Sequence, residues 1–411
     1  MSEWKVSSLK EFIKVSSGEG LPDSKMNPGQ HPVYGGNGIM GFHNEFLFKE
    51  PRLIIGRVGA LCGNVHITQN NSWITDNALI VSFLNSNEDV IFWYYILSNI
   101  NLREYAFQSA QPVITGGIVE KIKINIPVST SERGYIAHIL ITCDTVIKQT
   151  QSAIAKYKAI KQGLLHDLFT RGLDANGHLR PSYQEAPELY KESELGMIPK
   201  EWEVKRLDEF KIDILDGDRG VNYPKSTDFF PDEFCLFLSA TNVTKNGFVF
   251  QNMQFITKEK DLILGTGKLQ RNDIVLTTRG TVGNMAFYSA DIEYENLRIN
   301  SGMLILRNNQ NDINSTFLYL SIKEYIFGIE YGRVISGSAQ PQLPIKDFRK
   351  FNLLRPEIEE QNEITKRITS IDNIIQFEET LLQKYQSIKR GLMGDLLGGR
   401  KTVGERGDAV T

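Results

Sequence analysis

The sequence predicts an α+β protein with two pseudo-symmetric globules of mixed α and β structure. We expect the globules to be joined by two long helices that form an antiparallel coiled coil. Two observations predict this architecture. The chain repeats itself in the same order at a nearly constant offset, and each copy ends in a long segment whose apolar residues alternate by three and four positions.

The internal repeat is visible in short motifs along the whole chain. Any one match can arise by chance, but several in the same order indicate a tandem duplication of a unit of roughly half the chain. The matching pairs are EWKVSSL (Glu3–Leu9) with EWEVKRL (Glu201–Leu207), RVGALCGN (Arg57–Asn64) with RGTVGN (Arg279–Asn284), SAQP (Ser109–Pro112) with SAQP (Ser338–Pro341), and AKYKAIKQGLLHDL (Ala155–Leu168) with QKYQSIKRGLMGDL (Gln383–Leu396).

Each copy opens with a globule, predicted for residues 1–128 and 199–355. Both stretches contain short β-branched and aromatic runs bounded by Gly and Asn turns, which is the pattern of strands. An aromatic-rich segment in each, VIFWYYILSNI and STFLYLSIKEYIF, is long enough for a helix. The class expected for each globule is irregular α+β.

Each copy closes with a predicted spacer helix, at residues 129–171 and 356–397. Ser129 and Glu132 have the spacing of a capping box, and Pro356 with the glutamates after it suits a helix start. An amphipathic helix lying on its own globule would give a similar stripe, but two copies in one frame favour pairing. The predicted coiled-coil core is Ile139, Cys143, Val146, Tyr157, Ile160, Ile371, Ile374, Leu381, Tyr385 and Ile388.

The connections favour antiparallel helices. A polar linker at residues 172–198 leads into the second globule, which must deliver the chain to the start of the second helix. Antiparallel helices place these points at one end, with a tail left at residues 398–411. A heptad span of about 28 residues at 1.5 Å per residue is about 40 Å long, which is near the half-site spacing of symmetric DNA-binding proteins.

Composition and missing motifs exclude several classes of function. The net charge of −3 over 411 residues counts mildly against a nucleic-acid-binding protein, although basic residues can gather on one face. Three scattered cysteines fit neither a disulfide framework nor a metal site. No secretory signal or membrane-length apolar run is visible, so the cytoplasm is the expected compartment. We find no phosphate-binding loop and no methyltransferase motif, so no catalytic site and no bound cofactor are expected.

Three segments carry a family resemblance: IKQGLLHDLFTRGLD (Ile160–Asp174), ELGMIPKEWEVKRL (Glu194–Leu207) and IKRGLMGDLL (Ile388–Leu397). HPVYGGNGIMGFHNEF (His31–Phe46) adds to it. Over essentially its full length the chain resembles the specificity subunits of type I restriction-modification systems. The resemblance implies two target-recognition domains that each read one half of a split, asymmetric DNA site, with the helices as spacers.

The same resemblance implies partners. These are double-stranded DNA, two copies of a methylation subunit that modifies adenine N6, and motor-nuclease (restriction/translocase) subunits. AdoMet, ATP and Mg²⁺ would be bound by those subunits. A duplicated docking surface independently fits two copies of one partner.

Arginine favours guanine, and asparagine or glutamine favours adenine, so exposed loops with these residues are the candidates for base readout. Gly-Asn pairs are also ordinary turn formers. Identical glutamines in both copies more plausibly bind the DNA backbone or hold the loop than choose different bases. The candidates are Asn37, Arg57, Asn64, Gln111, Arg279, Asn284 and Gln340.

Two further sets complete the predicted sites. Phosphate contacts are expected from basic residues near these loops, with a solvated strand edge as the alternative: Lys121, Lys123, Arg333, Lys346, Arg349 and Lys350. Docking of the methylation subunit is expected at the repeated helix ends, with the closing turns of the coiled coil as the alternative: Leu164, Leu168, Phe169, Leu392, Leu396 and Leu397.

Two other functions stay open at this point. A coiled-coil scaffold that binds proteins without DNA would fit the low charge, and it would show no sequence preference in a DNA-binding test. A fused restriction enzyme that cuts alone would need the catalytic motifs that we do not find.

Overall fold

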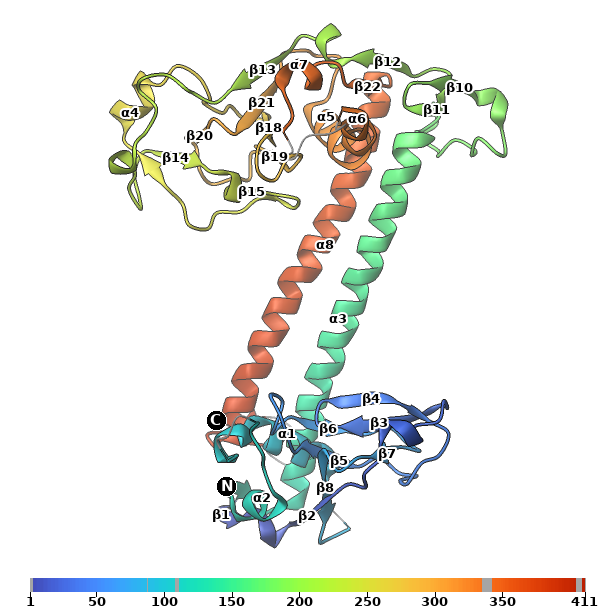
Figure 1. Ribbon diagram of the computed structural model, residues 1–411, viewed down its shortest axis with the longest axis vertical. Helices are drawn as coiled ribbons and strands as arrows, with labels where there is room; N and C mark the ends of the chain where they lie inside the picture. Colours follow the sequence, from blue (N-terminus) through green and yellow to red (C-terminus); the bar gives the residue numbers. More distant parts are fainter. Residues whose placement is uncertain (1–2, 87, 108–110, 335–341, 404–408, 411) are drawn as a thin grey trace. The chain divides into compact units, whose positions relative to one another are not determined.

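The computed structural model describes residues 3–86, 88–107, 111–334, 342–403 and 409–410. The chain forms two compact units (Figure 1). Unit 1 consists of Met1–Ile154 and Phe377–Thr411, and unit 2 consists of Ala155–Gln376. The chain therefore begins in unit 1, builds the whole of unit 2, and returns to unit 1.

Unit 1 contains a four-stranded antiparallel sheet, a three-stranded sheet and a separate strand pair. The strand orders are β2-β8-β5-β6, β4-β3-β7 and β1-β9. The bounds are β1 (Trp4–Ser8), β2 (Ile13–Ser17), β3 (His31–Gly35), β4 (Gly38–His43), β5 (Leu53–Gly56), β6 (Val65–Ile67), β7 (Trp73–Ile74), β8 (Ala78–Phe83), α1 (Val90–Asn99), α2 (Gly116–Lys121) and β9 (Lys123–Pro127).

Unit 2 repeats this topology strand by strand. Its sheets run β13-β21-β18-β19, β17-β14-β20 and β12-β22, with two added hairpins, β10-β11 and β15-β16. The bounds are β10 (Tyr190–Ser193), β11 (Gly196–Pro199), β12 (Glu203–Arg206), β13 (Ile212–Asp216), β14 (Cys235–Leu238), β15 (Val243–Thr244), β16 (Gly247–Phe248), β17 (Phe255–Ile256), α4 (Lys258–Ile263), β18 (Ile274–Thr277), β19 (Met285–Phe287), β20 (Leu297–Ile299), β21 (Met303–Asn308), α5 (Ser315–Ser321), α6 (Phe327–Val334), α7 (Ile345–Phe348) and β22 (Asn352–Arg355).

The match between the units extends to strand direction. In each three-stranded sheet the middle strand has one parallel neighbour: β3 runs parallel to β7, and β14 runs parallel to β20. Antiparallel pairs are otherwise the rule in both units. The duplication seen in the sequence is therefore present in the fold, and the α+β class is confirmed.

Two long helices, α3 (Thr130–Thr170) and α8 (Ile358–Leu392), each contribute to both units. The Ser129 hydroxyl accepts a hydrogen bond from the backbone N–H of Glu132 at 3.3 Å, so it caps α3 at its first turn. A π-helical turn, Met393–Leu397, follows α8. Both helices lie within a few residues of the spacer segments predicted from the sequence.

The helices run antiparallel within each unit. In unit 1 the Lys389 ammonium lies 2.6 Å from the Asp144 carboxylate, which also accepts a hydrogen bond from the Tyr95 hydroxyl at 2.6 Å. In unit 2 Lys161 lies 2.6 Å from Asp372. The two ion pairs are equivalent under the repeat, and in each the early part of one helix meets the late part of the other.

Three residues of the predicted coiled-coil core do not face the partner helix. Ile160, Ile374 and Ile388 are 45%, 43% and 44% exposed. At each place the next residue along the chain, Lys161, Ile375 or Lys389, turns inward instead, because a helix with 3.6 residues per turn drifts from a strict heptad frame. The other predicted core residues are buried or half-buried: Ile139, Cys143, Val146, Tyr157, Ile371, Leu381 and Tyr385.

The predicted linker, residues 172–198, is built into unit 2. Leu173, Leu195 and Ile198 are buried in the same core as the globule, and β10-β11 forms a hairpin within it. In the tail of unit 1, Thr402–Val403 pairs with Ala409–Val410.

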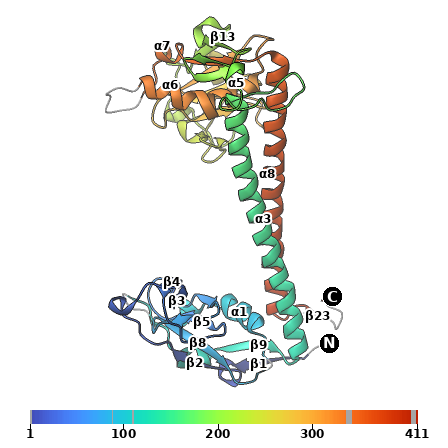
Figure 2. The same ribbon diagram turned by 90° about the vertical axis from the view of Figure 1, so that its right-hand side faces the viewer.

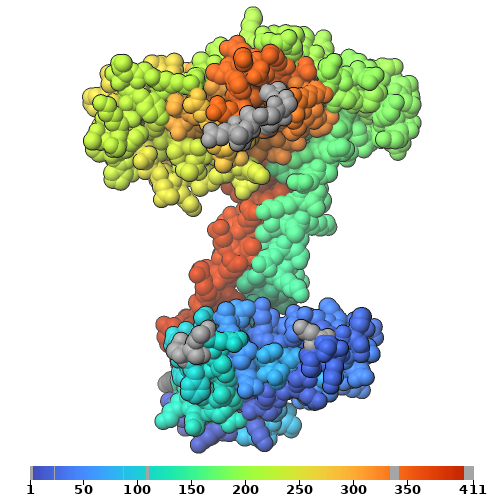
Figure 3. Space-filling view, viewed as in Figure 1, coloured from blue at the N-terminus to red at the C-terminus, as the bar shows by residue number. Residues whose placement is uncertain are grey.

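Each unit has its own apolar core. In unit 1, α1 lies between the four-stranded sheet and the helix pair (Figure 2), where Phe92 and Trp93 are fully buried. The face drawn in the space-filling view shows the outer atoms of each unit (Figure 3). No helix in the described ranges is both long and apolar enough to span a bilayer.

Candidate nucleic-acid interface

The four-stranded sheet of unit 1 has one end at which several candidate residues meet. Ser17 at the end of β2 pairs with Leu79, and Gly56 at the end of β5 pairs with Ala78 at the start of β8. The loops that leave β2 and β5 and the loop that enters β8 therefore lie together. We call this the loop end of the sheet.

Arg57 spans the loop end of unit 1. Its Nη1 donates to the Ser17 hydroxyl at 3.1 Å and to the Asp76 carbonyl at 3.3 Å. The Arg57 backbone carbonyl accepts a hydrogen bond from the Ile114 N–H at 2.9 Å, which holds the loop after residue 110 next to Arg57. The structure thus holds the guanidinium across the ends of two neighbouring strands.

Asn37 and Gln111 come together beside Arg57. Both are exposed and line a surface hollow of about 530 Å³, with Asn77 in its wall. The Gly36–Asn37 turn between β3 and β4 approaches this wall closely, since a Cβ on Gly36 would lie 3.1 Å from the Asn77 carbonyl oxygen. Three predicted base-reading residues of the first globule therefore share one surface.

Asn64 has a different position. It is exposed, and its backbone carbonyl accepts from Gly56 at 2.7 Å, which closes the loop between β5 and β6. Gly63 before it has a φ of 92°. The turn-forming interpretation of this Gly-Asn pair therefore has direct structural support.

The loop end of unit 2 is formed by the ends of β13 and β18 and the start of β21. It shows that the predicted pairing of Arg57 with Arg279 is wrong by one residue. The Thr278 carbonyl accepts from Leu343 at 3.2 Å, as the Arg57 carbonyl does from Ile114, so Thr278 is the equivalent of Arg57. The loop after β5 is one residue longer than the loop after β18, and this insertion hid the register. Arg279 is exposed and lies opposite Gln342. Gln340 lies outside the described residues.

Asn284 is half-buried, and both its side chain and its backbone are hydrogen-bonded within unit 2. Its side-chain Nδ2 donates to the Val243 carbonyl at 3.0 Å, and its backbone N–H donates to the Thr277 hydroxyl at 3.0 Å. The amide that was a candidate for base contact therefore ties the loop after β18 to β15.

We expect Asn284→Ala to lower the free energy of unfolding of unit 2 by about 1 kcal/mol, because the Val243 carbonyl loses its donor. Asn64→Ala, at the equivalent position but exposed, should change stability by less than about 0.5 kcal/mol. Urea unfolding of both variants measures the difference. Equal effects would contradict the structural role of Asn284.

Arg219 was missed by the sequence analysis. Its Nη2 lies 2.9 Å from the Asp216 carboxylate and 3.1 Å from the Ser301 carbonyl, at the loop end of unit 2, and its side chain is 49% exposed. The loop is fixed by Asp218, whose carboxylate accepts from the backbone N–H groups of Gly220 and Gly265, each at 2.7 Å. These hydrogen bonds lower the pKa of the Asp218 carboxyl. No motif match could reveal Arg219, since this loop has no recognisable copy in unit 1.

Most of the predicted phosphate-contacting residues lie away from the loop ends. Lys123 pairs with Ser8 on β1, and the carbonyl before Lys121 accepts from the Ser8 hydroxyl at 2.8 Å, so both lysines lie toward the opposite end of the sheet. In unit 2 the Arg349 carbonyl accepts from Asp208 just before β13. This places Arg349 and its neighbour Lys350 toward the corresponding opposite end. Lys346 lies at the start of α7, three residues after Leu343, which donates to Thr278 at the loop end. The phosphate contacts of these residues stay a prediction.

Arg333 is bonded within unit 2, and its phosphate contact stays a prediction. Its Nη1 lies 2.5 Å from the Glu330 carboxylate, and its Nη2 donates to the Glu194 carbonyl at 2.5 Å. Lys350 pairs with Asp347 at 3.1 Å. These cations already have partners within unit 2.

Most of the predicted docking leucines are covered by the protein itself. Leu168 and Phe169 are 0% and 1% exposed in the core of unit 2, and Leu396 and Leu397 are 1% and 5% exposed in the core of unit 1. Leu164 and Leu392 pack half-buried against the same cores. The alternative, in which each helix end closes a globule, therefore has direct structural support, and the docking role of these side chains stays a prediction.

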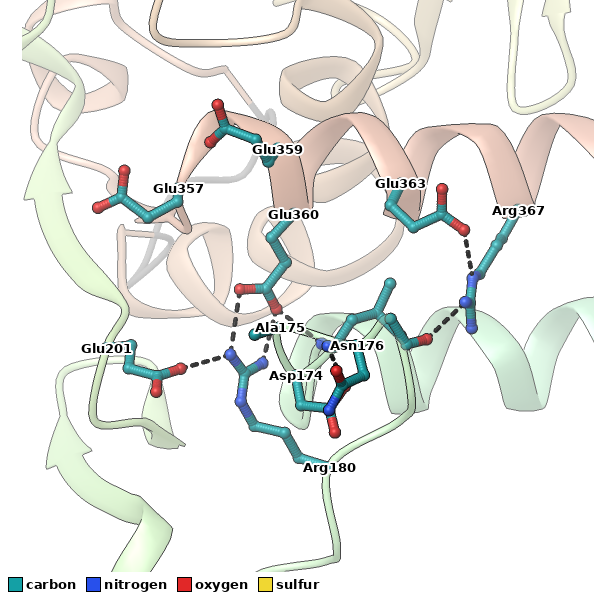
Figure 4. Close-up of a pocket in the computed structure, with 12 residues that line it drawn as sticks. Asp174, Ala175, Asn176, Arg180, Glu201, Glu357, Glu359, Glu360, Glu363 and Arg367 are labelled. Atoms are coloured by element: carbon teal, nitrogen blue, oxygen red, sulfur yellow. Dashed lines mark hydrogen bonds and ion pairs between the residues drawn. The ribbon is translucent and has the colours of Figure 1, made fainter.

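A buried ionic cluster ties residues 172–198, the predicted linker, to the start of α8. The Glu360 carboxylate accepts from Arg180 at 2.7 Å (Figure 4). It also accepts from Trp202 Nε1 at 3.0 Å and from the Leu173 N–H at 2.7 Å. Burial lowers the pKa of Arg180, but the carboxylates of Glu360 and Glu201 outweigh it and raise that pKa. The hollow beside the cluster holds glutamates and arginines, and among the described residues no group suited to a metal ion occurs.

Comparison with known proteins decides the family. The model described as "Type I restriction modification DNA specificity domain" matches residues 1–156 and again residues 199–386. The chain belongs to this type I specificity family. Its two matches coincide with the two copies of the fold.

Curated relatives of the type I specificity family agree. The chain is 25% identical to the MjaVIII specificity subunit of Methanocaldococcus jannaschii over 98% of this chain and 93% of that protein. It is 34% identical to the EcoprrI specificity subunit of Escherichia coli, where the match spans 35% of this chain and 37% of that protein.

Solved structures show the same fold. An S subunit of a type I restriction-modification system from M. genitalium superimposes with a TM-score of 0.65 at 17% identity, over 96% of both chains. A chain from a study of type I assembly and conformational transition gives a TM-score of 0.53 at 12% identity, over 96% of this chain and 97% of that one.

Type I specificity subunits are generally non-catalytic, and the family works in complex with methylase and restriction subunits and DNA.

Proposed function

We propose that this chain is the DNA-sequence-recognition subunit of a type I restriction-modification complex, with residues 1–128 and 199–355 as its target-recognition domains. Each domain reads one half of a bipartite, asymmetric DNA site. The helices α3 and α8 set the gap between the halves.

The observation that carries the proposal is that both units have the same scaffold but carry different side chains at their loop ends. The two units share strand order and the loop hydrogen bonds that position their loop ends. Unit 1 presents Asn37, Arg57 and Gln111 there, whereas unit 2 presents Arg219 and Arg279. Equal scaffolds with unequal donors and acceptors are what two different half-sites require.

The proposal includes two copies of a methylation subunit and the motor-nuclease subunits, which would bind AdoMet, ATP and Mg²⁺. Repetition of the same fold in the two units supports binding of one partner twice. Since the leucines of the helix ends are buried, Ile160 and Ile388 become the candidate docking contacts. They are equivalent under the repeat, and both are exposed.

Methylome sequencing of a host that expresses this chain with its methylation subunit tests the proposal. We expect N6-methyladenine on both strands of one bipartite, asymmetric motif. Exchange of residues 1–128 for another recognition domain should change one half of the motif and leave the other half intact. A host without a new methylated motif, or an exchange that alters both halves, would contradict the proposal.

A scaffold that binds proteins but not DNA is the second candidate, and the net charge of −3 favours it. Binding of the purified complex to DNA of defined sequence separates the two functions. A scaffold shows no sequence preference with or without the methylation partner.

A further inference from the structure

Arg57 and Arg219 occupy the same place in their respective units. Arg57 reaches from the loop after β5 to Ser17, the last residue of β2, and to the Asp76 carbonyl before β8. Arg219 reaches from the loop after β13 to Asp216, the last residue of β13, and to the Ser301 carbonyl before β21. Ser17 and Asp216 each end the first strand of the sheet, and Asp76 and Ser301 each precede the equivalent strand.

The two guanidinium groups are thus anchored in the same way from different loops. Within the described part of the chain, Arg57 uses only Nη1 and Arg219 uses only Nη2 in hydrogen bonds. A guanidinium carries five N–H donors, so anchoring through one nitrogen leaves donors for another partner. A side chain fixed in this way needs less ordering when it binds.

We infer that Arg219 is the guanine-reading residue of the second recognition domain and the functional counterpart of Arg57. The inference rests on the proposed function. It assigns to Arg219 the role that the sequence pattern had given to Arg279, which matches Val58 in the fold.

The surroundings of Arg219 favour a base over a phosphate. Asp216 replaces the neutral Ser17 beside the guanidinium, and a carboxylate at this distance repels a phosphate group. The same carboxylate is an acceptor for the N4 amino group of cytosine, so Arg219 and Asp216 together fit a G·C pair or step in the major groove. Asp218 bonds to Gly220 within this loop and ties the loop to Gly265, in the segment after α4, which preserves the geometry.

The test compares the methylomes of hosts that express the methylation subunit with the wild-type chain, Arg219→Lys, Arg57→Lys or Arg271→Lys. Arg271 is the matched control. Its Nη1 also donates to a backbone carbonyl, that of Ser289 at 2.7 Å, but it precedes β18 and so lies at the opposite end of the sheet. We expect Arg219→Lys to lower the preference for guanine at one position of one half-site by about 10-fold to 100-fold.

The other half-site should be unchanged in Arg219→Lys, and Arg57→Lys should relax that other half instead. Arg271→Lys should reproduce the wild-type motif. Arg219→Gln is the second variant: glutamine pairs with adenine, so the preferred base should move from guanine to adenine at the same position. A misfolded chain cannot show such a change of preference.

Several results would overturn the inference. An unchanged motif in Arg219→Lys and Arg219→Gln does so, as does a uniform fall in methylation at all sites, which marks a backbone contact. Loss of all methylation in both variants also overturns it, with or without a lower unfolding temperature. A wild-type methylome without a bipartite motif removes the proposed function itself, and that failure is visible before any Arg219 variant is compared.

Discussion

Replacement of Glu360 by alanine is expected to destabilise unit 2 by about 3–5 kcal/mol. Glu360 is the acceptor for a buried guanidinium, an indole N–H and a backbone N–H. Its removal leaves Arg180, whose side chain is 8% exposed, without its buried counter-charge. An uncompensated buried charge is costly, and the remaining partner, Glu201, is 73% exposed.

Hydrogen–deuterium exchange of the full chain measures this effect unit by unit. Exchange should accelerate in residues 155–376 and stay unchanged in residues 3–154. Glu363→Ala is the matched control, three residues further along α8. Glu363 pairs with Arg367 at 3.1 Å, with both side chains 37% exposed, so its loss should cost about 0–1 kcal/mol. Similar effects of the two substitutions would show that the Glu360 cluster is not a structural anchor.

Leu168→Ala and Leu396→Ala should each destabilise a different unit, by about 2–5 kcal/mol. Both leucines occupy the repeated helix-end motif, and both are almost fully buried: Leu168 in the core of unit 2 and Leu396 in the core of unit 1. A cavity at either place removes contacts within that core only. Denaturant unfolding followed by exchange mapping should therefore assign each loss to its own unit.

Ile160→Ala controls for a general effect of truncating an apolar side chain on α3. Its side chain is 45% exposed, so the free energy of unfolding should change by about 0.5 kcal/mol or less. A docking role of the leucines would give the reverse pattern, with normal stability and weakened binding of the methylation subunit.

The repeat and the helices could be predicted because their signals are strong and local. Paired motifs such as Lys161 with Lys389 mark equivalent points of two copies, and these residues form equivalent ion pairs. The choice of which residues on each helix face the partner helix could not be predicted. Adjacent apolar residues such as Ile374 and Ile375 leave the frame ambiguous by one position, and only packing decides between them.

The candidate site could be predicted only in part, since loops carry it. Asn37 and Gln111 were candidates because of their residue type and their loops, but only the structure shows that they line one hollow. Arg279 was matched to Arg57 because a one-residue insertion cannot be seen in two short Gly-rich loops. The helix-end leucines gave a pattern that suits docking and burial equally, and the segment at 172–198 that helps to cover Leu168 looked like an open linker.

The interleaving of the two units has a consequence for biosynthesis. Unit 2 is one continuous stretch, so a ribosome releases all of its parts before it has finished unit 1. The N-terminal globule therefore stays incompletely folded until Leu396 and Leu397 have been synthesised and can pack into its core. Termination of translation between Gln376 and Leu396 would therefore damage the domain that was made first and spare the one made second.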